Sequence, residues 1–560
     1  MERDRVSSLA FWIGTIAVAA LLILTRLPFY SDHFFDWDAT QLGLAIDRFD
    51  IAHHQPHPPG YLFYVLLARG LDLFVASPQR TFQILSSLMT GIGIAGTWAL
   101  ARRFCGLRGS VLAVVATLFH PYVWAYGVVG ESYAAEFAVS TWIGVLAVDA
   151  WRGRALAGLA AAALLGIAGG IRTSIPLFMA PLVAAAFLRG VPSWRVRAVA
   201  IGLAILGTVA WFVPTAISAG GATTFLTLTS NLTTGIVARL VSPLIGESMV
   251  WATNNITDIL AWTAMVPMPL LVASFPLLFV RSSTGVCSRP GPGLPWLCIL
   301  WVLPAMTFYL AMFASRPGYV LTYFAPLVVA VSALAERGAE ALVRRFAGRT
   351  NLVVWLLAPV VTVALCLRIF FDIGYLADTA GISAKSIGTA EDMLQMGLDA
   401  VAEHEASAGP GTTAFVVIHP APDWRRLSYY RPDVPIWLLM SKRNFPIGDG
   451  VDACRAQDRR FDCASGPGFW TNLELPDRLE VPVDAGTERL VILLPPSMLR
   501  EMAVKVPPDG GIREKSLRGY EYTVLEFGTG DEIRIDAFTL TRRSRLTEVA
   551  LQTPTGVTGH

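Results

Sequence analysis

Apolar runs long enough to cross a bilayer recur through the first two thirds of the chain. A membrane-spanning helix needs about 20 mostly apolar residues. Runs of this kind lie at 9–27, 81–101, 109–127, 132–150, 196–217, 256–280, 294–314, 319–335 and 351–371, and 155–188 is long enough for two short helices broken around Gly169-Gly170. The sequence therefore predicts a mainly α, polytopic membrane bundle of about eleven spans.

Composition agrees with a membrane protein. Hydrophobic residues make up 54% of the chain and charged residues 15%, whereas soluble domains carry about a quarter charged residues. The net charge of +2 comes from basic residues spread thinly through loops, so we expect no nucleic-acid partner. The run 9–27 lacks a small-residue cleavage site and precedes many further spans, which indicates a first transmembrane helix rather than a signal peptide.

The arginines indicate which side each loop faces. The apolar segment 58–76 carries Arg69 and Asp72, and each charge at the bilayer centre would cost about 2.5–3.5 kcal/mol. If 58–76 stays on the outer surface, sixteen of the 24 arginines up to Arg368 lie inside and eight outside; if it crosses, the counts become seven and seventeen. The positive-inside rule favours the first arrangement. We therefore expect an outer loop with interfacial helices at 28–80, a cytoplasmic N-terminus and an external C-terminal region.

From residue 372 the composition is that of a soluble domain. Strand-like runs occur at 414–419, 435–440, 489–494, 520–527 and 532–539, with a helical stretch near 389–405. This predicts a transmembrane domain at 1–371, a periplasmic or extracytoplasmic α/β domain at 372–546 and a disordered tail at 547–560. The stretch 448–468 is interpreted as a loop.

Two of the six cysteines lie in this polar region. Cys454 and Cys463 are close in sequence, and in an oxidising compartment we expect them to form a disulfide. The other four are interpreted as small apolar residues of the membrane part.

Asp36 and Asp38 flank Trp37 directly after the first span. One interpretation makes Asp36 a solvated turn residue and Asp38 the N-cap of the helix that follows. The other gives the two carboxylates a function as base, metal ligand or both, because charge beside lipid is disfavoured unless it is used. Glu131 is a third acid at an outer helix boundary and can be either an interface residue or a functional one.

Histidines precede a stiff turn in the same loop. His54 and His57 are followed by Pro58-Pro59-Gly60, which argues against a helix here. A zinc site built from His53, His54, His57 and an aspartate is one alternative. In the other, these histidines donate hydrogen bonds to an anionic ligand or stabilise the turn.

Two arginines lie at outer ends of spans, against the positive-inside trend. Arg172 follows the glycine break, and Arg316 precedes the rigid turn Pro317-Gly318-Tyr319. Guanidinium groups in such places suggest an anionic partner such as a lipid phosphate. The alternative is that both are arginines whose apolar stems cover the interface.

Five motifs taken together resemble those of the GT-C class of integral membrane glycosyltransferases. They are, in chain order, "FDWDA", "HPPGYLFYVLL", "RRFCGLRG", "GESYAAEF" and "RPGYVLTYFAPL". The resemblance covers roughly residues 1–371 and is strongest to family 39-like enzymes related to protein O-mannosyltransferases and lipid A aminoarabinose transferases. The chain departs from the family in one place: Asp38-Ala39 stands where an Asp-Glu pair is usual.

The resemblance implies a GT-C fold and transfer of a sugar, with inversion, from a polyprenyl-phosphate-linked donor to a glycan, lipid or protein acceptor at the outer membrane face. It implies a bacterial inner-membrane protein with a periplasmic C-terminal domain, and it makes Asp38 or Asp36 the general base. The residues expected to bind the donor phosphate or the substrate are His54, His57, Glu131, Arg172, Arg316 and Tyr319. No cofactor is required; a divalent cation on Asp36, Asp38 and Glu131 is an alternative.

A transporter or flippase of a lipid-linked or anionic substrate is the main rival. Such a protein favours internal repeats and broken helices at the bilayer midplane. The sequence has no repeated halves, although the break within 155–188 would suit a transporter.

Overall fold

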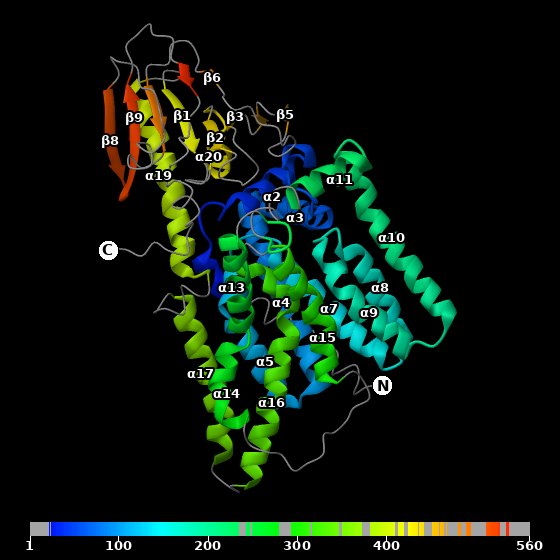
Figure 1. Cartoon of the computed structure of the whole chain (residues 1–560). Coiled ribbons are helices and arrows are strands. Elements are labelled where there is room, and N and C mark those ends of the chain that lie inside the picture. The colour runs from blue at the N-terminus through cyan, green and yellow to red at the C-terminus, as the bar shows by residue number, and fades with distance from the viewer. Residues whose placement is uncertain are drawn as a thin grey trace.

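The computed structural model describes residues 22, 24–233, 242–246, 249–278, 293–313, 316–345, 350–371 and 381–408, and shorter C-terminal stretches at 413–418, 424–434, 436–441, 451–457, 460–463, 466–467, 480–482, 489–493, 511–526 and 534–536. Most of the predicted first span and the predicted tail at 547–560 lie outside the described residues. The described chain forms a helical bundle with a mixed sheet at one end, which we call the sheet-bearing end (Figure 1).

Five described segments are long and apolar enough to cross a membrane. They are α4 (Pro78–Phe104), α7 (Tyr133–Trp151), α10 (Trp194–Ser218), α15 (Leu294–Ala311) and Pro317–Val343, which joins the 3-10 helix η4 (Pro317–Tyr323) to α16 (Phe324–Arg345). The pair α13 (Met249–Met265) and α14 (Met268–Leu278) meets the same criteria together and is bent by 50°. Shorter apolar helices are α5 (Leu107–Phe119), α8 (Ala155–Ala168), α9 (Ser174–Gly190) and α17 (Thr350–Phe370). Each coincides with a predicted run, so the polytopic helical bundle is confirmed.

Prolines divide two of the predicted single spans. The run 109–127 contains α5 and then the short helix α6 (Pro121–Tyr126), which begins at a proline that has no N–H to donate. The His120 ring accepts a hydrogen bond from the backbone N–H of Tyr122 (3.2 Å) and caps α6. Pro267 lies in the same way between α13 and α14. Each of these two predicted runs is therefore built from two helices.

Small residues allow the helices of the bundle to approach closely. A side chain at Gly166 of α8 would collide with the backbone of Ala204 in α10, and one at Gly93 of α4 would collide with the ring of Phe137 in α7. The hydrophobic effect does not drive helices together within lipid, so their association depends on close packing. Small residues at the crossings permit that packing because they let the two backbones approach.

Three short elements lie at the sheet-bearing end between the first span and α4. They are α2 (Trp37–Asp47), the 3-10 helix η2 (Ile51–His53) and α3 (Leu62–Val75), and they follow the 3-10 turn η1 (Leu27–Phe29). The helix α11 (Ala222–Ser230) lies at this end too (Figure 1). The elements α2, η2 and α3 fall within the predicted outer loop at 28–80, with η1 at its start, and α3 is not among the described helices that could span a membrane.

The two charges of α3 are used by the fold. Arg69 donates to the carbonyl oxygens of Ala45 and Ile46, both at 2.8 Å, and so holds the C-terminal end of α2. Asp72 accepts a hydrogen bond from the hydroxyl of Thr81 (2.6 Å) in the first turn of α4. Both charges of α3 thus have polar partners within the protein.

The C-terminal domain is built on an eight-stranded mixed sheet in the order β5-β4-β3-β2-β1-β7-β9-β8. Its central strand β1 runs parallel to β2 and β7, and the outer pairs are antiparallel. The strands are β1 (Thr413–Ile418), β2 (Ile436–Ser441), β3 (Val451–Gln457), β4 (Arg460–Cys463), β5 (Gly466–Pro467), β7 (Arg489–Ile492), β8 (Gly511–Leu517) and β9 (Tyr520–Glu526), with β6 (Glu480–Pro482) and β10 (Arg534–Asp536) as a separate pair. The helices α19 (Ala384–Ala408) and α20 (Trp424–Tyr430) bury a core with these strands that includes Leu394, Leu427, Phe415 and Val491.

The five predicted strands and the predicted helix all coincide with elements of this domain. The interpretation of 448–468 as a loop was wrong, because β3, β4 and β5 lie within it. Charged residues interrupt the alternation in "VDACRAQ" and "RFDC", and strands near a sheet edge tolerate such residues. In the β3–β4 pairing the backbone of Cys454 lies directly opposite that of Cys463.

Candidate active site

Asp36 and Asp38 lie at the start of α2, at the sheet-bearing end (Figure 1). The Oδ1 atom of Asp36 accepts a hydrogen bond from the backbone N–H of Ala39 (2.9 Å), so Asp36 is the N-cap. Asp38 lies inside the first turn of the helix. The expectation that Asp38 caps this helix was therefore wrong, because α2 begins at Trp37, one residue before Asp38. The Asp38 side chain is 37% exposed and its carboxylate has no capping role.

One guanidinium group joins three acids from two separate parts of the chain. Nη1 of Arg316 pairs with Oδ2 of Asp36 and lies 3.0 Å from Oε1 of Glu131. Nη2 of Arg316 lies 3.9 Å from Oδ2 of Asp38. We call Asp36, Asp38 and Glu131 with Arg316 the acid cluster. The structure thus brings together four of the residues that were selected from the sequence.

The turn after Arg316 explains where its side chain lies. Pro317 begins η4, and Gly318 packs on the ring of Tyr133 in α7, where an added Cβ would lie 2.6 Å from Cγ of the ring. Any larger residue at position 318 would push the turn away from α7. The glycine therefore lets Arg316 reach Glu131, which lies just before α7.

Glu131 is the buried member of the acid cluster, with 2% of its surface exposed. Its backbone carbonyl accepts hydrogen bonds from the hydroxyls of Tyr64 (2.9 Å) and Ser86 (3.1 Å), which fix the loop between α6 and α7. Burial, and then the negative charge of Asp38, raise the pKa of Glu131 well above its usual value. Glu131 therefore binds a proton at a higher pH than an exposed glutamate would.

His57 lies beside the acid cluster in a defined hydrogen-bonding arrangement. Its Nδ1 is 2.8 Å from Oε1 of Gln41 and its Nε2 is 2.9 Å from the hydroxyl of Tyr61. Because the amide oxygen only accepts, Nδ1 carries the proton and Nε2 accepts from Tyr61. Burial lowers the pKa of His57, although the Asp38 carboxylate, 3.7 Å from Nδ1, opposes this shift.

A second, deeper ion pair lies behind the acid cluster. Nε of Arg172 is 3.0 Å from Oε2 of Glu136, and Nη1 donates to the hydroxyl of Ser132 (2.8 Å). The other Glu136 oxygen, Oε1, accepts from the hydroxyls of Ser174 and Thr322, both at 2.7 Å. Arg172 is thus held by the protein itself, as a buried charge must be.

Three tyrosine rings surround the Arg172 guanidinium. Its central carbon lies 4.2 Å from the ring centre of Tyr133, 5.1 Å from that of Tyr319 and 5.8 Å from that of Tyr61. Ring faces stabilise a cation at such distances. The Tyr61 ring also contacts His57 edge to face, and the Tyr319 ring contacts that of Tyr133 in the same way. All the predicted binding residues except His54 therefore occupy one continuous region.

His54 lies apart from this region. It is 2% exposed and its backbone has a left-handed conformation, with φ of 55°. Burial lowers the pKa of His54 well below the usual value. His53 pairs with Asp50 (2.9 Å), so the three histidines do not converge as a zinc site would require.

The three acids do not fit a divalent cation as they are arranged. The guanidinium of Arg316 lies among Asp36, Asp38 and Glu131, where its positive charge offsets one of their negative charges and repels a cation placed beside it. In the part of the chain that the structure describes, no group of three or more histidine, cysteine, aspartate or glutamate residues is arranged to hold a metal.

Sequence reasoning missed Gln41 and Tyr61. Both had a local signal: Gln41 follows Asp38 by three residues and so lies on the same face of α2, and Tyr61 follows His57 by four. The partners Ser132 and Thr322 had none, because their contacts depend on how distant helices pack.

Comparison with known proteins identifies the fold. No family model matches the sequence, and no curated protein matches it. Among solved structures, the chain is similar to ArnT from Cupriavidus metallidurans bound to undecaprenyl phosphate, with a TM-score of 0.52, 14% identity, and coverage of 92% of this chain and 98% of that one. The apo structure of the same ArnT gives a TM-score of 0.52, 15% identity, and coverage of 93% and 98%.

The protein is thus a polytopic membrane protein with the GT-C-type glycosyltransferase fold. At this level of identity the comparison establishes the fold, and it covers the C-terminal domain as well as the bundle. The predicted fold class is confirmed, and the predicted resemblance is confirmed at the level of the GT-C-type fold.

Proposed function

We propose that this protein is a membrane glycosyltransferase that moves a sugar from a polyprenyl-phosphate-linked donor to an acceptor glycan, lipid or protein. The fold supports this proposal, and the solved ArnT structure with the same fold has undecaprenyl phosphate bound. We further propose that the sheet-bearing end faces the periplasm, that the N-terminus is cytoplasmic and that transfer occurs at the outer face of the inner membrane. The arginine distribution of the loops supports this orientation.

The observation that carries the proposal is the position of the Asp38 carboxylate. It is 37% exposed and lies 3.9 Å from Arg316 and 3.7 Å from His57. Asp36, in contrast, caps α2 with one oxygen and pairs with Arg316 through the other. Asp38 is therefore the acid that has a carboxylate available to a substrate, and we assign it as the general base.

The proposed reaction needs one proton acceptor and one positive charge. Asp38 takes the proton of the acceptor hydroxyl or amine, whose lone pair attacks the anomeric carbon from the side opposite the phosphate. The bond between the anomeric carbon and the phosphate oxygen breaks, and its electron pair leaves with the polyprenyl phosphate, which inverts the anomeric configuration. Arg316, 28% exposed, stabilises the charge that develops on the phosphate.

The remaining residues are proposed to shape the donor site. His57 and Tyr319 supply polar groups beside the acid cluster, Glu131 and Asp36 hold Arg316, and Arg172 provides a second positive charge behind the tyrosine rings. His54 contributes through the backbone of its turn. The leaving group is a phosphate, which needs charge stabilisation more than protonation, so these residues suffice for the reaction.

Donor turnover tests the proposal. The purified protein is incubated with radiolabelled undecaprenyl-phosphate-linked hexoses and pentoses, and the release of undecaprenyl phosphate is measured with and without membrane extract as acceptor source. We expect Asp38→Asn to lower turnover about 10²–10⁴-fold, the usual contribution of a general base. The matched control is Asp32→Asn, which changes an 82% exposed acid of the same loop that pairs with Arg80.

The outcomes separate the two functional classes. Wild-type turnover by Asp38→Asn would refute the assignment of the base. A transporter or flippase would instead move the labelled lipid across a proteoliposome membrane without releasing undecaprenyl phosphate, and that result would refute sugar transfer.

A further inference from the structure

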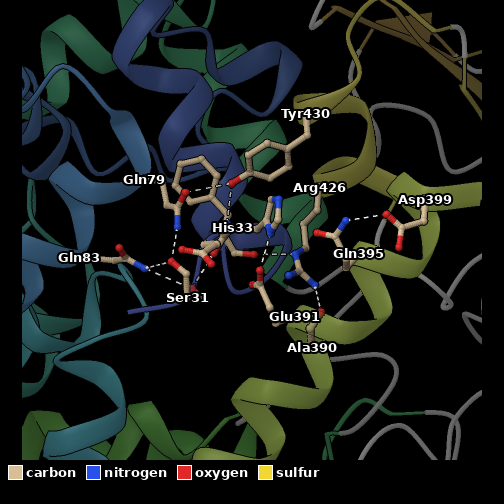
Figure 2. Close-up of polar contacts among 12 residues, drawn as sticks. Ser31, His33, Gln79, Gln83, Ala390, Glu391, Gln395, Asp399, Arg426 and Tyr430 are labelled. Carbon is tan, nitrogen blue, oxygen red and sulfur yellow. Dashed lines mark hydrogen bonds and ion pairs between the residues drawn. The ribbon is translucent and has the colours of Figure 1, made fainter. Parts of the chain in front are cut away.

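The short helix α20 of the C-terminal domain contacts two loop segments, one leading into Asp36 and Asp38 and the other into His57. Its sequence "WRRLSYY" contains two consecutive arginines, Arg425 and Arg426, which are 2% and 3% exposed. Figure 2 shows Arg426 and Tyr430 reaching from the C-terminal domain toward the transmembrane domain, with Tyr430 beside Gln79 at the start of α4. An arginine that is buried in a domain interface donates hydrogen bonds there, so the acceptors of Arg425 and Arg426 indicate what these side chains do.

Arg426 and Tyr430 hold both backbone hydrogen-bonding groups of Phe34. The N–H of Phe34 donates to the hydroxyl of Tyr430 (2.7 Å), and its carbonyl accepts from Nε of Arg426 (2.6 Å). Nη1 of Arg426 donates to the carbonyl of Ala390 in α19 (2.8 Å), which fixes the guanidinium within its own domain. Phe34 precedes Asp36 by two residues, so the segment that leads into the acid cluster is held from the C-terminal domain.

Arg425 holds the second segment. Its Nη2 donates to the carbonyl oxygens of His53 and His54, both at 3.0 Å. This turn precedes His57 by only three residues. Two adjacent side chains of one helix therefore hold two loop segments that are separated in sequence, one bearing Asp36 and Asp38 and the other bearing His57.

The tryptophan between the two aspartates belongs to the same interface. Trp37 packs against the hydrophobic core of the C-terminal domain, and α2 contacts α20 directly. A further ion pair between His33 and Glu391 of α19 joins the same loop to the C-terminal domain (Figure 2). Side chains of the C-terminal domain thus hold this segment at His33 and Phe34, and Trp37 packs on the same domain.

We propose that Arg425, Arg426 and Tyr430 are positioning residues, through which the C-terminal domain sets the place of Asp38 relative to Arg316 and His57. The catalytic part of this inference rests on the proposed function. A base must lie within hydrogen-bond reach of the proton that it takes, and a displacement of about 1 Å costs roughly 10²-fold in rate. The C-terminal domain is accordingly part of the active site.

Hydrogen exchange of the segment 30–40 tests positioning without reference to activity. Tyr430→Phe keeps the ring but removes the acceptor for the Phe34 N–H, and Arg426→Gln removes the charged fork. Both variants should raise exchange at Phe34 and at the first turn of α2 at least tenfold. The control Arg431→Gln removes contacts to Glu405 and Asp433, which lie wholly within the C-terminal domain, and should leave that exchange unchanged.

Steady-state kinetics with an undecaprenyl-phosphate-linked hexose test the catalytic consequence. We expect Arg426→Gln to lower kcat about 10–100-fold with little change in KM, and Arg426→Lys to restore only part of it, because lysine cannot donate in two directions from a planar fork. In an Asp38→Asn background, Arg426→Gln should cost little more, because no base remains to be misplaced.

Each outcome decides one part of the inference. Unchanged exchange in Tyr430→Phe would overturn the positioning role, and this variant also carries the test if Arg426→Gln cannot be isolated folded. Raised exchange with wild-type kcat would overturn the catalytic consequence. If Asp38→Asn alone has wild-type kcat, the assignment of Asp38 as the base fails, and if the wild-type protein releases no undecaprenyl phosphate, the proposed function fails. In both cases the exchange result still stands on its own.

Discussion

The buried pair of Arg172 and Glu136 gives the most quantitative prediction. Their side chains are 9% and 0% exposed, and the atoms that pair are 3.0 Å apart. At an effective dielectric constant of about 20 the direct attraction is about 5 kcal/mol, most of which offsets the cost of burying both charges. Removing one partner leaves the other buried without its counter-charge, which costs about 3–5 kcal/mol.

Two single variants and their combination measure this coupling. Arg172→Met removes the cation, and Glu136→Gln keeps an oxygen that accepts from the hydroxyls of Ser174 and Thr322. Each single variant should lower the free energy of unfolding by about 3–5 kcal/mol. The double variant should be destabilised by about 2–3 kcal/mol less than the sum of the two, because neither charge is then left unpaired.

Thermal unfolding in one detergent at fixed protein concentration is the assay, followed by tryptophan fluorescence. The control is Arg154→Met: this arginine is 69% exposed and lies 3.2 Å from Asp149, so its loss should cost less than about 1 kcal/mol. If the double variant loses as much stability as the two single variants added together, the pair does not interact as described and the reasoning is refuted.

Three further predictions follow from the same structure. Asp36→Asn keeps a good helix cap and removes only the charge beside Arg316, so Asp36→Ala should be about 1 kcal/mol less stable than Asp36→Asn in thermal unfolding; equal stability would exclude the cap. Burial lowers the pKa of His57 below its usual 6.5, so the unfolded chain takes up a proton that the folded protein does not, and stability should fall as the pH drops below 6.5. His57→Gln should weaken that dependence, and an unchanged stability profile would contradict it. Cys454 and Cys463 should be found linked by mass spectrometry of the unreduced protein, since opposite residues of antiparallel strands are within disulfide reach; alkylation of both thiols would contradict this.

The sequence predicted well whatever depends on long patterns. Runs of apolar residues located the spans because lipid imposes a length and a composition on every helix that crosses it. Short continuous apolar runs such as "TAFVVI" located the central strands of the C-terminal sheet because those strands are buried. Strands near the edge of the sheet, such as "VDACRAQ", were missed because such strands tolerate charged and polar residues, which hide the strand pattern.

The candidate site was only partly predictable. Asp36, Glu131 and Arg316 were each selected from local context, but their convergence depends on packing that no single segment contains. The distinction between Asp36 and Asp38 was decided by where α2 begins, and helix ends are the least certain feature of a sequence pattern. Helix α20 gave no signal at all, because a seven-residue helix has too few turns to show a period.

The helix α3 connects an exposed apolar surface to two parts of the candidate active site. Its Leu73 and Phe74 side chains are 83% and 86% exposed, while Arg69 holds the end of α2 and the backbone N–H of Phe63 donates to the carbonyl of Gly170 (2.8 Å), two residues before Arg172. A change in bilayer thickness or lateral pressure that tilts α3 should therefore move the C-terminal end of α2 and Gly170 together. Under the proposed function, rates measured in nanodiscs of graded acyl-chain length should then differ even when donor, acceptor and protein are the same.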